Sequence, residues 1–85
     1  MSFVQITPGA EIATGSMPPD DQRAVNDLIE RLDDGNVTGA VEVASMNAYR
    51  VRAHGFWLVF DRPEPNALRI LDVVPNTRAR VLYGW

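Results

Sequence analysis

The sequence predicts a single α+β domain, with one strand, a short helix and a long helix packed on a C-terminal antiparallel β-meander. Three observations support this. The chain has 85 residues, enough for one core and no second domain, so residues 1–85 are expected to form one unit. Apolar residues recur at helical spacing between Val25 and Leu32, and at alternate positions from Ala48 to Val74. The two periodicities occupy separate halves of the chain, which is typical of α+β folds.

The first elements are a strand and a short helix. Residues Phe3 to Thr7 are β-branched or aromatic at most positions and predict a strand. Thr7 then suits the N-cap of a helix and Pro8 its first position. Because Gly9 and Gly15 flank the next residues, this helix is limited to about two turns.

A longer amphipathic helix follows. Pro18 and Pro19 mark its start, while Asp20 and Asp21 complement the positive end of the helix dipole. Four apolar residues share one face: Val25, Leu28, Ile29 and Leu32. Gly35-Asn36 ends the helix. We interpret it as a core-packing element with a solvated acidic face.

The second half of the chain predicts a meander. Residues 36–47 are expected to form a loop that Val41, Val43 and Met46 pin to the core. The three expected strands are Ala48–Ala53, Phe56–Asp61 and Ala67–Val74. Residues 79–83 are expected to form a short final strand or an extended tail.

His54-Gly55 predicts a two-residue hairpin turn, which fixes the register of its strands. Counting outward pairs Ala53 with Phe56, Arg52 with Trp57, and so on to Tyr49 with Phe60. One face then carries the apolar residues Tyr49, Val51, Phe56, Leu58 and Phe60. The other face carries Arg50, Arg52, Trp57, Val59 and Asp61. From the pattern alone, the arginines and the indole either grip a phosphate and stack a base or form a cation–π pair that shields the tryptophan.

The charges are divided between the halves of the chain. The net charge is -3, but residues 1–42 hold two arginines against eight acidic residues, and residues 43–85 hold six arginines against three. All eight basic residues are arginine, whose planar guanidinium suits phosphate and carboxylate contacts. The alternative is that these arginines only solubilise a sheet.

Several classes of function are disfavoured. The chain has no cysteine and one histidine, so no metal site or cofactor is expected. It has no apolar run long enough to span a membrane and no signal-peptide pattern, so a cytoplasmic location is expected. A chain this short buries only about 60 to 65% of its unfolded surface, so a partner protein or a homodimer is an expected source of stability.

The order of these elements resembles the RelE/ParE family of bacterial toxins along nearly the whole chain. Four segments carry the resemblance: Phe3–Ala10, Tyr49-Arg50-Val51-Arg52, Leu58-Val59-Phe60, and Leu71–Val74 running to Val81-Leu82-Tyr83. The resemblance implies the toxin of a type II toxin–antitoxin module. Its partners would be a cognate antitoxin protein and, in the nuclease branch, the ribosome and messenger RNA.

In that branch the family cleaves messenger RNA without a metal, by attack of a ribose 2′-hydroxyl on the adjacent phosphate. By resemblance, Arg50, Arg52, Arg78 and Tyr83 are the catalytic candidates. Arg50 and Arg52 match the basic pair on the first meander strand, Arg78 an arginine after the last strand, and Tyr83 the terminal tyrosine. Trp57 and Arg80 are the candidate substrate-binding residues, with Trp57 stacking on a base.

Three features depart from the nuclease pattern. Trp57 stands where the family has a second-strand arginine, and an indole cannot neutralise a phosphate. Arginine is a poor proton acceptor, and His54 lies in the predicted turn, so a general base is missing. The net charge of -3 also differs from the strongly basic balance expected of a ribosome-directed nuclease. Tyr83 has an alternative role, because it can equally pack the chain end onto the sheet together with Trp85.

Three hypotheses follow. The first, which we prefer from the sequence because Arg50, Arg52, Arg78 and Tyr83 all remain, is a RelE-like, ribosome-dependent mRNA endoribonuclease that inhibits translation. The second is a ParE-like or degenerate toxin that acts only by binding a protein target or its antitoxin, which the missing arginine favours. The third is a structural dimer held by pairing of strand edges.

Overall fold

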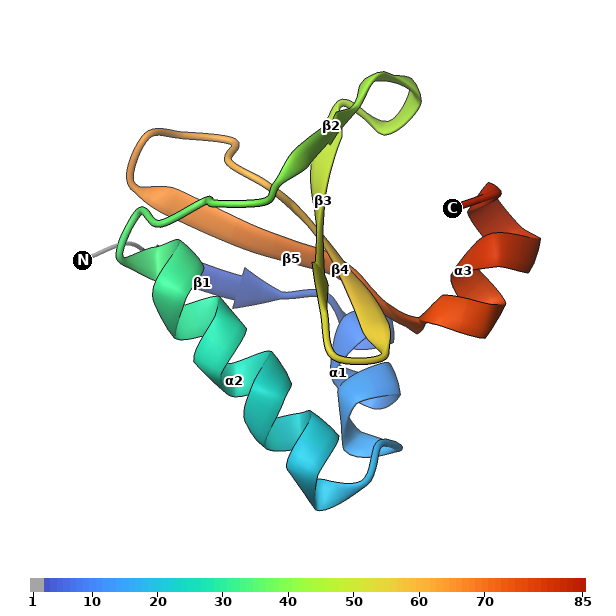
Figure 1. The fold of residues 1–85 in the computed structure, drawn as a ribbon. Coiled ribbons are helices and arrows are strands. Elements are labelled where there is room, and N and C mark those ends of the chain that lie inside the picture. The colour runs from blue at the N-terminus through green and yellow to red at the C-terminus, as the bar shows by residue number, and fades with distance from the viewer. Residues whose placement is uncertain (1–2) are drawn as a thin grey trace.

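The computed structural model of the chain describes residues 3–85 and has an α+β fold around a five-stranded sheet. Its elements in chain order are β1 (Phe3–Ile6), α1 (Pro8–Gly15), α2 (Pro19–Asp33), β2 (Val41–Val43), a 3-10 turn (Ala44–Met46), β3 (Ala48–Ala53), β4 (Phe56–Asp61), β5 (Ala67–Pro75) and α3 (Asn76–Tyr83). Figure 1 shows α2 along one side of the sheet. Helix α3 is set apart from α2 and lies beside β4 and β5. The predicted fold class is confirmed.

The sheet has the order β1-β5-β4-β3-β2. Strands β2 to β5 form an antiparallel meander, and β1 lies at the edge, parallel to β5. The predicted register of the β3–β4 hairpin is confirmed for all its pairs, from Ala53 with Phe56 to Tyr49 with Phe60. His54 has a φ of 49° in the turn, which is the left-handed conformation that a tight hairpin requires.

The core lies between the sheet and the two N-terminal helices. Thr7 caps α1 by accepting a hydrogen bond from the Ala10 amide at 3.3 Å, as its sequence predicts. The apolar face of α2 packs on the sheet. Seven residues expected to form one core are all buried: Val25, Leu28, Leu32, Val51, Leu58, Phe60 and Ile70. Burial of such side chains is the main favourable term in folding. Two others expected on the same apolar faces are not, because Tyr49 is 41% exposed and Ile29 is only partly buried.

The segment expected to be a loop contains a strand. Val41–Val43 pairs with β3 as β2, and Asn47, at a φ of 51°, turns the chain back after the 3-10 turn. Val41 and Met46 are exposed, so the prediction that they pin the segment to the core was wrong. Backbone pairing with β3 holds this segment, and a three-residue strand is too short for its alternation to be recognised.

The C-terminal segment is a helix, so the expected strand or extended tail was wrong. Arg78, Ala79, Arg80 and Leu82 favour a helix, and Gly84, at a φ of 78°, supplies a left-handed C-cap. Ala79 is fully buried against the sheet. Because α3 covers Val59 and Val74 on the face away from the core, that face is only partly open to solvent.

A β-bulge shifts the pairing of β5 with β4. Val59 pairs with Asp72, but the next residue, Phe60, pairs with Ile70, so Leu71 is the extra residue. Ile70 and Val73 therefore both face the core, while Asp72 lies on the opposite face. The bulge thus places a carboxylate in the same row as Arg50 and Val59.

Candidate functional site

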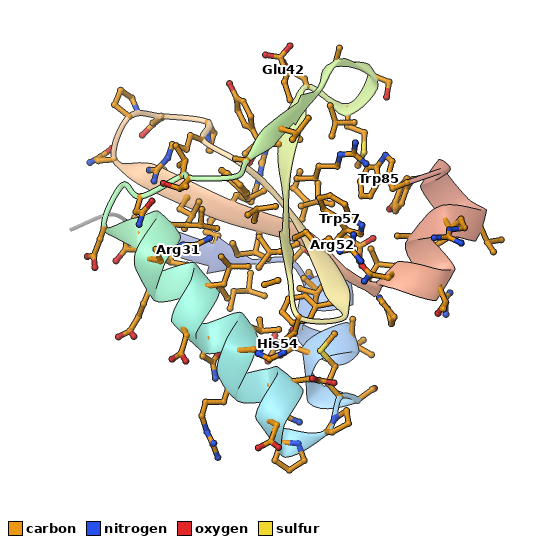
Figure 2. All side chains as sticks on the ribbon, viewed as in Figure 1. Arg31, Glu42, Arg52, His54, Trp57 and Trp85 are labelled. Carbon is orange, nitrogen blue, oxygen red and sulfur yellow. The ribbon has the colours of Figure 1, made fainter. Side chains whose placement is uncertain are left out.

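The candidate residues of the hairpin lie together on the face of the sheet away from the core. Arg50 and Arg52 are two positions apart on β3, and Trp57 pairs with Arg52 from β4. Figure 2 shows Arg52, Trp57 and Trp85 close together between the hairpin and α3. His54 lies at the hairpin tip, away from Trp85.

Helix α3 brings two further aromatic residues onto this face. Tyr83 is on its last turn, and the left-handed Gly84 turns the chain so that the Trp85 amide bonds to the Ala79 carbonyl at 3.5 Å. The Trp85 ring then stacks on Tyr83, with centroids 4.3 Å apart, and meets Trp57 edge-on at 5.8 Å. Arg50, Trp57, Asp72, Tyr83 and Trp85 are called the arginine–tryptophan cluster below.

Arg50 is the centre of the cluster. Its guanidinium carbon lies 4.7 Å from the ring centroid of Trp57 and 4.7 Å from that of Trp85, so each indole makes a cation–π contact with it. Its Nε is buried and has no hydrogen-bond partner among the described residues. Arg52 is exposed and lies 5.9 Å from the Trp57 centroid. The two arginines thus have different environments.

Tyr83 is held by a carboxylate that the sequence did not indicate. Its hydroxyl donates a hydrogen bond to Asp72 Oδ2 at 2.8 Å, and Oδ1 of Asp72 accepts from the Val73 amide, also at 2.8 Å. Burial, followed by the hydrogen bond and the charge of Asp72, raises the pKa of Tyr83 above its ordinary value. Tyr83 is therefore protonated at neutral pH and poorly suited to be a general base.

The other two candidates, Arg78 and Arg80, do not join this cluster. Both are exposed on α3, and within residues 3–85 neither side chain forms a hydrogen bond or an ion pair. Arg78 lines a cavity of about 450 Å³ between α1 and α3, together with Leu82 and Asp72. The structure therefore brings together Arg50, Arg52, Trp57 and Tyr83 of the six candidates.

Comparison with known proteins found no relative whose site could be compared with this one. No protein-family model, curated protein or solved structure matches the chain.

Sequence reasoning missed Asp72 as a site residue and left the position of Trp85 open. Trp85 was considered only as a packing residue beside Tyr83, and the structure gives it that packing. Asp72 could be placed only with the register of β5, which the bulge conceals.

The side chains of the cluster are better suited to binding another molecule than to transferring a proton. It presents indole and phenol rings, one guanidinium between them and one carboxylate. Among the described residues, no group of three or more histidine, cysteine or acidic side chains could hold a metal ion. Over the same residues, no helix is long and apolar enough to cross a membrane.

Proposed function

We propose that the chain is the toxin component of a type II toxin–antitoxin module of the RelE/ParE type, and that it acts by binding a protein through the arginine–tryptophan cluster. The order of strand, two helices and meander supports the family assignment. The observation that carries the mode of action is the position of the Arg50 guanidinium between Trp57 and Trp85. The proposed place of action is the cytoplasm.

Three features of the cluster favour protein binding over cleavage of RNA. The indoles cover Arg50, and its Nε is buried, so this side chain offers few N–H groups to a phosphate. The carboxylate of Asp72 lies beside the tyrosine and would repel the charge that develops on a phosphorane. The Tyr83 hydroxyl donates a hydrogen bond to Asp72 and keeps its proton, so it is not the phenolate that could accept a proton from a 2′-hydroxyl.

The composition of the cluster matches the centre of a protein interface. Tryptophan, tyrosine and arginine are the residues whose truncation most often weakens protein complexes. Trp57 and Trp85 are half-buried, so part of each ring remains available to a partner. The exposed Arg52 beside Trp57 supplies a charged rim.

A second candidate function is RelE-like cleavage of messenger RNA on the ribosome, a reaction that needs no metal or cofactor. The exposure of Arg52, Arg78 and Arg80 favours it, because these guanidinium groups are free to contact RNA phosphates. Arg50 and Tyr83 would then have to leave their present partners. This candidate therefore requires α3 to move, whereas protein binding does not.

Expression in a bacterium, alone and together with the neighbouring gene, tests the proposal. We expect growth arrest when the protein is produced alone and recovery when the neighbouring protein is present. Transcript ends mapped during arrest distinguish the two candidates, since only the second predicts new cleavage sites in translated messages. Absence of arrest at a well-detected level of folded protein would contradict the toxin assignment.

A further inference from the structure

A hollow lies beyond the C-terminal end of α2, on the face of the sheet opposite the arginine–tryptophan cluster. Its volume is about 620 Å³, within the range of small-ligand sites. Its lining includes Asp33, Asp34, Val37, Tyr49, Phe60 and Arg62. The residues come from the end of α2, the segment before β2, strands β3 and β4, and the β4–β5 loop.

One wall of the hollow is aromatic. Tyr49 stacks on Phe60 with ring centroids 5.7 Å apart and planes inclined by 26°. Phe60 is buried in the core, but Tyr49 is 41% exposed although both lie on the core face of the sheet. The hollow thus has a solvent-accessible aromatic ring fixed against a rigid core residue.

The surroundings are more negative than positive. Asp34 lies at the C-terminal end of α2, where the helix dipole is negative and a carboxylate is unfavourable. Glu42 pairs with Tyr49 across β2 and β3, so its side chain lies on the same face. Of the lining residues, Arg62 alone is basic, and its guanidinium already donates a hydrogen bond to the Leu32 carbonyl. A second cation in the hollow would be attracted by the Asp34 carboxylate and the negative end of α2.

The remaining lining is apolar, with Val37, Ala40 and Pro65 at the hollow. An apolar wall, an exposed ring and carboxylates together match a side chain that has an aliphatic stem and a cationic head. We propose that the hollow binds an arginine or lysine side chain carried by a segment of a partner protein. The stem lies against Val37 and Pro65, and the head lies between the Asp34 carboxylate and the Tyr49 ring. This site is separate from the arginine–tryptophan cluster and does not depend on the proposed function.

The probe is a blocked pentapeptide with a central arginine flanked by serine and glycine. The control is the same peptide with citrulline in place of arginine, because citrulline has nearly the same shape but no charge. Both are titrated into the isotopically labelled 85-residue chain and followed by NMR. The arginine peptide is expected to shift the amide signals of Gly35, Ala40 and Tyr49, and to bind about two- to fivefold more tightly than the citrulline peptide, the range for an exposed cation–π contact. Higher salt should reduce the difference in affinity between the two peptides, because it screens the charge of the arginine.

Two variants locate the binding. Asp34→Asn and Tyr49→Leu are each expected to weaken arginine-peptide binding about two- to fivefold. Asp20→Asn is the matched control, because it makes the same change in net charge at the opposite end of α2, about 21 Å away along the helix. Binding by the control should equal that of the wild type. A dispersed NMR spectrum confirms that each variant is folded.

Three results would overturn the inference. Equal affinity for the arginine and citrulline peptides would show that no cation site exists. Equal losses in Asp34→Asn and Asp20→Asn would show only a general charge effect. Stronger shifts of the same signals by spermidine than by the arginine peptide would assign the hollow to a free polyamine instead of a partner segment. None of these results bears on Trp57, so the proposed function is tested separately.

Discussion

The guanidinium of Arg50 lies 4.7 Å from the ring centroid of Trp85, so a residue that follows α3 closes over a side chain of β3. Trp57 covers the same guanidinium at the same distance. This arrangement joins the C-terminal segment to the hairpin and turns a face with a predicted phosphate-binding arginine into an aromatic surface.

Trp85→Ala should loosen α3. The change removes a cation–π contact with Arg50 and the stack with Tyr83, which together are worth about 1–2 kcal/mol of the free energy of unfolding. Urea denaturation measures the loss. Val81→Ala is the control, because Val81 is 84% exposed on the same helix and its truncation should change stability by less than about 0.5 kcal/mol. Equal stability of Trp85→Ala and the wild type would show that the stack contributes nothing.

Tyr83→Phe should remove an alkaline loss of stability. The pKa of Tyr83 is raised in the folded state, so its contribution is fully present below the ordinary pKa of 10.0 and is lost as the pH rises through the folded-state value. The free energy of unfolding should therefore fall with pH above about 10 more steeply in the wild type than in the variant. At neutral pH the variant should lose about 0.5–1.5 kcal/mol with the hydrogen bond to Asp72.

Urea denaturation of the wild type and Tyr83→Phe, from neutral pH to pH 11, measures both the loss of stability at neutral pH and its further fall above pH 10. Thr14→Val serves as a control for loss of a hydroxyl, because its hydrogen bond to the Ala10 carbonyl does not involve a tyrosine. It should retain the wild-type slope above pH 10. An unchanged slope in Tyr83→Phe would contradict the assignment of the alkaline transition to this residue.

Leu28→Ala should unfold a large part of the population. Leu28 is 5% exposed between α2 and the sheet, and truncation of such a leucine costs about 2–5 kcal/mol. A domain of this size has little stability to spare. Thermal unfolding should show a clear fall in Tm, whereas Asn26→Ala, on the exposed side of the same helix, should leave Tm nearly unchanged. A normal Tm for Leu28→Ala would mean that α2 is not docked on the sheet.

The hairpin shows how far the sequence alone could lead. A two-residue turn fixes every pair of β3 and β4, so the meeting of Arg50, Arg52 and Trp57 followed from counting outward from His54-Gly55. The next connection is longer and the next strand has a bulge at Leu71. Simple alternation along β5 would put Asp72 on the same face as Ile70, which is the core face. Counting therefore could not show that Asp72 shares a face with Arg50.

The C-terminal segment shows a different limit. Residues 76–83 are too few for a helical period to stand out, and Val81 and Tyr83 suit a strand as well as a helix. The Gly84 cap was the available signal. Because the position of Tyr83 and Trp85 depends on α3, the closing of the cluster over Arg50 could not be predicted.

Trp57→Arg separates the two candidate functions. This change restores the arginine that the resemblance places on the second meander strand and removes one ring from Arg50. If the protein acts only by binding, the variant should produce no new transcript ends on translating ribosomes. If cleavage is the function, added positive charge should raise the cleavage rate, and Arg50→Ala together with Arg52→Ala should abolish it.

The affinity of Trp57→Ala for the protein encoded by the neighbouring gene tests the central claim most directly. Truncation of a tryptophan at the centre of an interface costs about 2 kcal/mol or more, so Kd should rise about 30-fold or more above the wild-type value. Arg31→Ala is the control, because Arg31 is exposed near the end of α2, away from the cluster, and its Kd should match the wild type. A folded Trp57→Ala that binds this protein as tightly as the wild type would contradict protein binding through the arginine–tryptophan cluster.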